Sequence, residues 1–131
     1  VDHGIEMPDE RLQRGKSERG TLSITARRNG DFYFITFKDD GRGVDPQRVL
    51  EVAAKRGIVV PTGISREEIF MLLAAPGLSS KDAVTELSGR GIGLDVVRYE
   101  AQQLGGDLSI RSELGEGTEI TVWFKHRSSL L

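Results

Sequence analysis

The sequence predicts an α+β fold, a two-layer sandwich in which helices cover one face of a mixed, mostly antiparallel sheet. Two pairs of short segments with alternating apolar residues, one near each end of the chain, indicate β-hairpins. Between these pairs, helix-capping residues precede apolar residues at helical spacing. At 131 residues the chain is long enough for one domain with its own core.

The first part of the chain predicts a short helix and a hairpin. Residues 1–16 are interrupted by glycine and proline, so we expect a helix end followed by a short polar helix or turn. Residues 21–26 alternate apolar and hydroxyl side chains, and residues 32–38 are aromatic and β-branched, which is typical of strands. Asn29 and Gly30 lie between them and tolerate the positive φ of a tight turn.

Two helices are predicted in the middle of the chain. Asp45, followed by proline, is an N-cap, and Gly57 ends that helix after about ten residues. Ser65 and Glu68 have capping-box spacing at the start of the next helix, which a proline closes. The serine- and glycine-rich residues 76–90 predict a long mobile loop.

The last part of the chain predicts a helix and a second hairpin. Apolar residues recur at helical spacing from Leu94 to Leu104, and two glycines follow as a stop. Residues 107–112 and 119–124 alternate like strands, and the glycine-containing residues 113–118 join them. These elements complete the predicted sandwich.

The composition argues against several classes of function. The net charge of −2, with interspersed charges, gives no support to nucleic-acid binding. The absence of cysteine excludes a disulfide framework, a thiolate nucleophile and cysteine metal sites. No apolar run approaches the roughly 18 residues of a membrane span, so we expect a cytoplasmic protein with no direct membrane insertion. The first residue is not Met, and we expect the chain to be an internal piece of a larger protein.

The stretch SGRGIGLDVV, residues 88–97, places three glycines directly before a predicted helix. The free N–H groups and the dipole of a helix N-terminus attract phosphate, and missing Cβ atoms let phosphate approach closely. A hinge or tight turn would use the same glycines for their φ freedom alone. The spacing is not that of a dinucleotide fingerprint or a P-loop. From this motif alone, phosphate binding and a flexible turn both remain open.

The stretch DDGRG, residues 39–43, directly follows a predicted strand. A carboxylate beside bare backbone can accept a hydrogen bond from the amino group of a flat ring such as adenine. An Asx turn at the strand end explains the same residues structurally, whereas the later ligands of a calcium loop are absent. His3 and His126 lie near opposite ends of the chain, so we expect no two-histidine metal site.

Taken in order, five segments resemble the successive sequence boxes of the GHKL ATPase superfamily, which holds histidine kinases, Hsp90, DNA gyrase and MutL. They are VDHGIE (1–6), DDGRGVD (39–45), PGLSS (76–80), SGRGIGLDVV (88–97) and GEGT (115–118). Within the superfamily, VDHGIE, ERG before a strand and SGRGxGxDVVR are similar to the ATP-binding catalytic domain of CheA-type chemotaxis histidine kinases. The resemblance implies an incomplete Bergerat ATP-binding fold over residues 1–125, with residues 126–131 as a tail.

The resemblance implies that the chain binds the adenine of ATP through residues of two motifs. Asp39 would accept a hydrogen bond from the adenine amino group. Gly41 and Gly43 would let the ring sit close to the backbone. Thr118 would lie near the adenine and contact it through its hydroxyl or a water molecule.

It also implies a phosphate-binding end. Ser79 and Lys81 would belong to a lid over the phosphates, Arg48 would add a basic contact, and Asp2 and His3 would complete the asparagine box. The residues that would wrap the triphosphate at the helix N-terminus are Gly89, Arg90, Gly91, Ile92, Gly93 and Leu94.

The chain also departs from the family pattern. In the family, Asn-Ala precedes VDHGIE, and that asparagine helps to hold Mg²⁺; here it would lie upstream of Val1. We therefore expect no complete metal site, and no kinase activity from this chain alone. The helices and strand that precede this box in the family lie outside the chain as well, so an exposed apolar patch is expected. Leu78 stands where the family lid usually has Phe.

For the intact protein, the resemblance implies a kinase that transfers the γ-phosphate of Mg-ATP to a histidine on a separate phosphotransfer domain. A response regulator would receive the phosphate next, and a receptor-coupling protein and a dimer partner would bind through other domains. Two alternatives remain. One is an inactive interaction module that retains the fold, and the other is a different GHKL ATPase, similar to Hsp90 or MutL.

Overall fold

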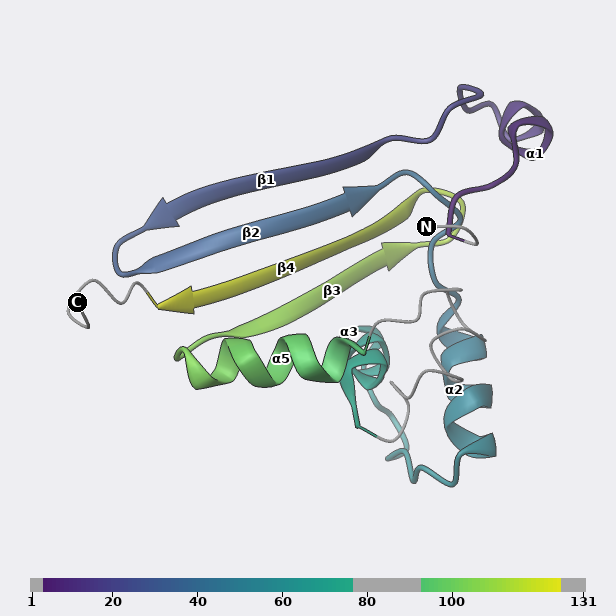
Figure 1. Cartoon of the computed structure of the whole chain (residues 1–131). Coiled ribbons are helices and arrows are strands. Elements are labelled where there is room, and N and C mark those ends of the chain that lie inside the picture. Colours follow the sequence, from purple (N-terminus) through teal and green to yellow (C-terminus); the bar gives the residue numbers. More distant parts are fainter. Residues whose placement is uncertain (1–3, 77–92, 126–131) are drawn as a thin grey trace.

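The computed structural model describes residues 4–76 and 93–125, and its elements follow the predicted order (Figure 1). They are α1 (Pro8–Gln13), β1 (Leu22–Asn29), β2 (Phe32–Asp39), α2 (Pro46–Lys55), α3 (Arg66–Met71), the 3₁₀ helix η1 (Leu72–Ala74), α5 (Leu94–Gln103), β3 (Asp107–Glu113) and β4 (Gly117–Lys125). The predicted α+β class is confirmed. The loop predicted at residues 76–90 lies, apart from Pro76, outside the described residues.

The sheet has four strands in the order β1-β2-β4-β3. Every pairing in the described part of the chain is antiparallel, so the parallel component that a mixed sheet would need is not present there. Each edge strand is joined to its neighbour by a local hairpin, and the central β2–β4 pairing joins the two hairpins. That central pairing brings the end of β2 next to the start of β4.

The two hairpin turns differ from the sequence expectation in detail. In the first, only Gly30 has a positive φ, of 62°, and Asn29 pairs with Phe32 as part of the ladder. In the second, β3 extends to Glu113 and β4 already begins at Gly117, so the joining segment is shorter than the predicted residues 113–118. A Cβ atom on Gly117 would come within 2.0 Å of the Asp39 carbonyl oxygen, so this glycine marks a close approach inside the sheet.

The predicted helix starts are confirmed. Asp45 caps α2, because its carboxylate accepts a hydrogen bond of 3.0 Å from the backbone N–H of Gln47. Ser65 and Glu68 form the predicted capping box at the start of α3. None of the described helices is long and apolar enough to cross a lipid bilayer.

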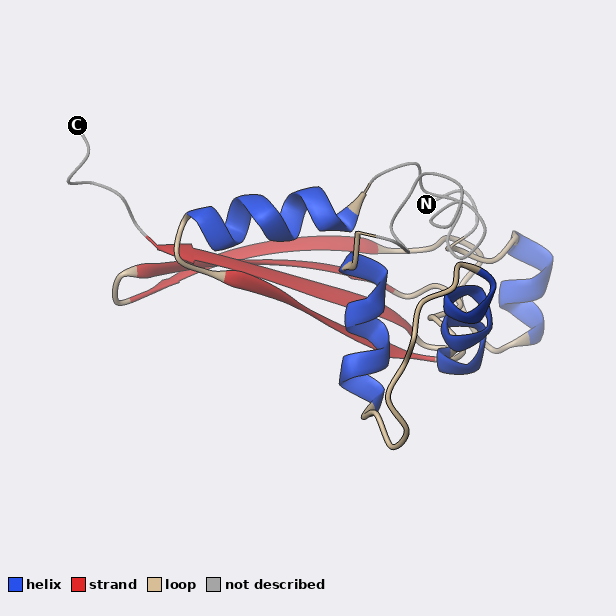
Figure 2. Ribbon diagram, turned by 90° about the horizontal axis from the view of Figure 1, so that it is seen from below, coloured by secondary structure: helices blue, strands red, loops and turns tan. Residues whose placement is uncertain are grey.

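The core lies on one face of the sheet, under α5, α3 and η1 (Figure 2). Leu108 pairs with Val122 and Ile110 with Ile120, so these four side chains share that face. Phe70 and Ala74 pack against them, together with the partly buried Leu94 and Val97 of α5. A second cluster, around Val49, Val52 and Ile69, joins α2 to α3.

None of the described helices covers the same face over β1 and the neighbouring part of β2. The register places Ile24 opposite Phe37, which in turn lies opposite the core residue Ile120. Ile24 is 69% exposed and Phe37 is 44% exposed, and every residue of β1 is exposed. We call this surface, on which Leu22, Ile24 and Phe37 are exposed, the uncovered half-sheet. The expected exposed apolar patch is therefore confirmed at this place.

Candidate functional site

Three segments that are distant in the sequence meet at the end of β2. They are the loop of residues 39–44, the segment of residues 4–17 that contains α1, and the β3–β4 turn. The N–H of Arg42 donates to the carbonyl oxygen of Gly4 at 2.8 Å. The N–H of Gly115 donates to the carbonyl oxygen of Arg42 at 2.7 Å. The loop after β2 is thus fixed to both of its neighbours.

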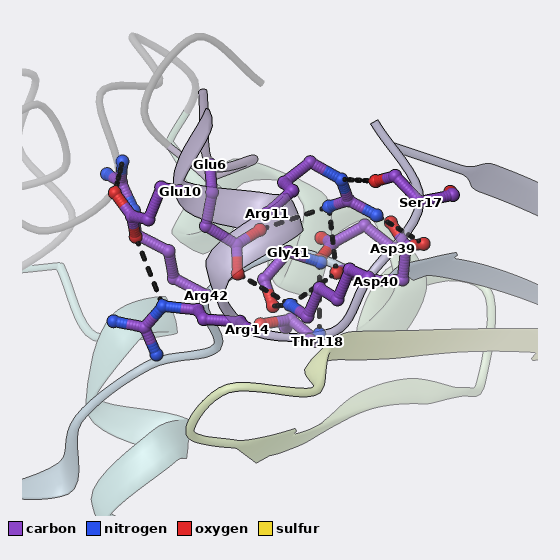
Figure 3. A network of polar contacts seen from close by, with 12 residues as sticks. Glu6, Glu10, Arg11, Arg14, Ser17, Asp39, Asp40, Gly41, Arg42 and Thr118 are labelled. Carbon is purple, nitrogen blue, oxygen red and sulfur yellow. Dashed lines mark hydrogen bonds and ion pairs between the residues drawn. The ribbon is translucent and has the colours of Figure 1, made fainter. Parts of the chain in front are cut away.

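Asp39 lies at the centre of this meeting point and is 8% exposed. Its Oδ1 atom accepts hydrogen bonds from the backbone N–H groups of Gly41, at 2.9 Å, and Thr118, at 3.2 Å (Figure 3). An ionised carboxylate is an acceptor only and has about four acceptor positions. In both of these bonds Asp39 acts as the acceptor of an N–H group.

Gly41 and Gly43 are required by the packing of the chain itself. A Cβ atom on Gly41 would lie 2.0 Å from the carbonyl oxygen of Gly4. Gly43 has φ of +77°, and a Cβ atom there would lie 2.2 Å from the carbonyl oxygen of Glu113. These contacts explain both glycines without a ligand, and their role in admitting a flat ring stays a prediction.

Ser112 is a residue of this site that the sequence analysis missed. Its hydroxyl accepts a hydrogen bond of 2.7 Å from the N–H of Val44 and donates one of 3.0 Å to the carbonyl oxygen of Gly117. It also lies 2.9 Å from the hydroxyl of Thr118. The signal that could have found it is the hairpin register, which places Ser112 directly opposite Thr118.

The second missed feature is a network of ion pairs around the buried Glu6 and Arg11 (Figure 3). We define it as Glu6, Arg11, Lys16 and the partly exposed Asp40, and call it the buried ionic network. Arg11 belongs to α1 and is 1% exposed, although the helix looks polar in sequence. It pairs with Glu6 at 3.0 Å and with Asp40 at 2.9 Å, and Lys16 pairs with Glu6 at 2.5 Å. The network connects the start of the chain to the residue next to Asp39.

The surroundings of the two carboxylates in this network lower their pKa. Burial would raise the pKa of Glu6, but the hydrogen bond from Lys16, a backbone hydrogen bond and the charges of Lys16 and Arg11 outweigh it. Burial would likewise raise the pKa of Asp40, but the Thr21 N–H, the Arg11 hydrogen bond and the Arg11 charge lower it below its ordinary value. Both groups are therefore held in the charged form at neutral pH.

The predicted phosphate-binding residues are only partly described. Gly93 is the N-cap of α5 and Leu94 its first residue, so their backbone lies at the positive end of a ten-residue helix. The Leu94 side chain packs against the core. Arg48 is an exposed residue of α2. The other predicted residues lie outside the described residues: Asp2, His3, Ser79, Lys81, Gly89, Arg90, Gly91 and Ile92.

The described residues contain no group of three or more His, Asp or Glu side chains that could hold a metal ion. Asp39, the buried carboxylate of the site, is engaged by backbone N–H groups on Oδ1, which is the arrangement of a hydrogen-bond acceptor.

The chain is similar to proteins of known type. A family model described as histidine kinase-, DNA gyrase B-, and HSP90-like ATPase matches residues 1–128. The chemotaxis protein CheA of Klebsiella aerogenes is 44% identical over 93% of this chain, and that of Bacillus subtilis is 39% identical over 93%. The gliding motility regulatory protein of Myxococcus xanthus is 42% identical over 93%. The matched region is 19% of the first two proteins and 16% of the third, so the chain spans less than a fifth of their length.

Proposed function

Because this chain belongs to the histidine kinase-, DNA gyrase B-, and HSP90-like ATPase family, we propose that it is the ATP-binding catalytic domain of a CheA-like histidine kinase. The observation that carries the proposal is the buried Asp39 carboxylate, held by the backbone N–H groups of Gly41 and Thr118 where three segments distant in the sequence converge. The similarity to CheA proteins over 93% of the chain supports the same function.

In this proposal, the site recognises adenine by its hydrogen-bond pattern. The Asp39 carboxylate accepts from the exocyclic amino group. The Thr118 hydroxyl, which lies 2.9 Å from the hydroxyl of Ser112, contacts the same ring directly or through water. Guanine carries an acceptor oxygen where adenine carries this amino group. A carboxylate opposite that oxygen is repelled, so the site prefers ADP and ATP to GDP and GTP.

The phosphates extend toward the N-terminus of α5, where the N–H groups of Gly93 and Leu94 and the helix dipole favour negative charge. Ser79 and Lys81 close over them, and Arg48 adds positive charge. Bound Mg²⁺ supplies bridging and neutralisation of the phosphate charges. The Mg²⁺ ligands lie, at least in part, outside the described residues.

In the intact protein, a histidine nitrogen of a separate phosphotransfer domain attacks the γ-phosphorus. The P–N bond forms as the bond to the β-phosphate oxygen breaks, and ADP leaves. The phosphoryl group then passes to a response regulator in the cytoplasm. In this proposal, phosphotransfer, dimerisation and receptor coupling are functions of other parts of the intact protein. The chain itself spans less than a fifth of the length of its relatives.

The test is titration calorimetry of the full chain with Mg-ADP and Mg-GDP, using Asp39→Asn. We expect the substitution to weaken ADP binding by roughly 10- to 100-fold, the size of a lost charge-assisted hydrogen bond. Asp31→Asn is the matched control, because Asp31 is exposed in the β1–β2 turn at the other end of β2. Binding of neither nucleotide by a chain that melts cooperatively would favour the alternative of an interaction module that retains the fold.

A further inference from the structure

The buried ionic network contacts the backbone of the two residues that follow Asp39. Arg11 donates from Nη1 to the carbonyl oxygen of Asp40 at 3.2 Å, in addition to its bond with the Asp40 carboxylate. Lys16 donates from Nζ to the carbonyl oxygens of Asp40 and Gly41, both at 2.8 Å. The carbonyl oxygens of the two residues that follow Asp39 are therefore held by cations from the α1 segment.

The α1 segment is itself held rigidly. Arg11 Nε donates to the carbonyl oxygen of Ser17 at 2.7 Å, which closes the turn after α1. Glu6 shares its two oxygens between Arg11 and Lys16, at 3.0 and 2.5 Å, and its side chain is fully buried. The two cations thus approach the loop from a fixed framework.

The charges of this network balance, since two cations face two carboxylates. A buried ion pair of this kind is weak grounds for stability, because desolvation offsets much of the attraction. What this network fixes is the backbone of Asp40 and Gly41. The Gly41 N–H is one of the two backbone donors described for the Asp39 carboxylate, at 2.9 Å, and the Thr118 N–H is the other, at 3.2 Å.

We propose that Lys16 and Arg11 are positioning residues for nucleotide recognition, which set the direction of the Asp39 carboxylate by holding the two peptide groups that follow it. This inference rests on the proposed adenine-binding role of Asp39. Neither cation contacts the nucleotide in this proposal. Their effect reaches the ligand through the Gly41 N–H and Asp39.

A positioning role and a purely structural role predict different effects of substituting these residues. A residue that only stabilises the fold lowers the melting temperature and leaves the Kd of the folded protein unchanged. A residue that positions Asp39 changes the Kd for ADP and the preference for ADP over GDP, measured well below the melting temperature. Lys16 is the better target, because it is less buried than Arg11.

The experiment measures the Kd of Mg-ADP and Mg-GDP by calorimetry for the full chain and for Lys16→Met. We expect Lys16→Met to weaken ADP binding roughly tenfold, equivalent to one charge-assisted hydrogen bond, and to reduce the ADP-to-GDP preference. Lys16→Arg, which keeps the donors and the charge, restores most of both. Lys38→Met is the matched control, because Lys38 is an exposed lysine directly before Asp39.

Loss of Lys16 leaves the buried Glu6 carboxylate with one cation fewer, which can impair folding. The double variant Lys16→Met with Glu6→Gln removes that unbalanced charge. We expect it to regain melting temperature relative to Lys16→Met without regaining ADP affinity. The proposal is overturned if folded Lys16→Met, or the double variant, binds ADP with the affinity and preference of the unchanged chain.

The same measurements show whether the positioning role alone is wrong or the proposed adenine site is wrong as well. If the unchanged chain binds ADP and Asp39→Asn loses it, the adenine site stands, and only the Lys16 result decides the positioning role. If the unchanged chain binds no ADP, or Asp39→Asn binds it equally well, the adenine site itself is wrong and the positioning role falls with it.

Discussion

The carboxylate of Asp39 and the backbone amide of Thr118 lie 3.2 Å apart, although 79 residues separate them in the sequence. Asp39 is the last residue of β2, and Thr118 is the second residue of β4. The β2–β4 pairing brings the two strand ends together, and the bond then joins the carboxylate to the second hairpin. The sheet topology therefore creates the site, because it brings together residues that are distant in the sequence.

Ser112→Ala should lower the free energy of unfolding by about 1–3 kcal/mol, because the N–H of Val44 and the carbonyl oxygen of Gly117 lose their hydroxyl partner. Urea denaturation measures this. Ser109→Ala is the matched control, since Ser109 lies on the opposite face of the same strand, and we expect a change within about 0.5 kcal/mol. Equal effects of the two substitutions would contradict the role given to the Ser112 hydroxyl.

Gly43→Ala should destabilise the chain by about 2–5 kcal/mol, since the substitution combines a positive φ with a Cβ atom placed 2.2 Å from the Glu113 carbonyl oxygen. Gly63→Ala separates the two causes. Gly63 has φ of +79° but nothing within 4 Å of the Cβ position, so only the backbone strain of about 1–2 kcal/mol should remain. Denaturant midpoints of the two variants provide the comparison, and a Gly43→Ala variant no less stable than Gly63→Ala would show that the turn moves away at little cost.

The stability of the chain should fall in acid. Glu6, Asp40 and Asp107 each have a pKa lowered in the folded state, so the unfolded chain binds protons at a higher pH than the folded chain does. Their contribution is present above the unfolded pKa values, near pH 4, and is lost as the pH falls through the lower folded values. Urea denaturation at pH 7, 5, 4 and 3 should give nearly constant stability at first and a decline below about pH 4.

Substitution of Asp107 tests directly whether a charged carboxylate makes the folded chain more stable at neutral pH than in acid. Burial would raise its pKa, but hydrogen bonds from Arg98 and the Leu108 N–H and the Arg98 charge lower it. Asp107→Asn should therefore be less stable than the unchanged chain at pH 7, with a difference that shrinks toward pH 3. Salt should reduce the difference as well, because both side chains are about one-third exposed. A difference that stays constant with pH would mean that the charge of Asp107 is not what stabilises the fold.

The elements with local signals were predictable from the sequence. Asp45, Ser65 and Glu68 cap the helices where they were expected, because capping depends on residues within one turn of each other. The predicted start of the last strand, at residue 119, was wrong by two residues, because β4 begins at Gly117. A glycine that closely approaches a distant strand cannot be told in sequence from a glycine in a loop.

The contacts that build the site were less predictable. Asp39 and Thr118 were identified through the family resemblance, and the structure does bring them together. Arg11, Lys16 and Ser112 were missed, because each acts through partners that only the folded chain supplies. Arg11 was the hardest of the three to identify, since a charged residue in a short polar helix is normally exposed. In the structure it is buried and bonded to Glu6, Ser17 and Asp40.

The uncovered half-sheet has a consequence for how the sheet opens. β1 is exposed along its whole length and is held by its pairing with β2, whereas β4 lies between two strands with helices on one face. Local opening free energies should therefore be lowest at β1. In a central antiparallel strand, successive N–H groups point to alternate neighbours, so amide hydrogens of β2 directed to β1 should exchange faster than those directed to β4. Protection would then alternate along a single strand, and Asp39 ends that strand on the boundary between the part of the sheet that opens and the part that stays closed.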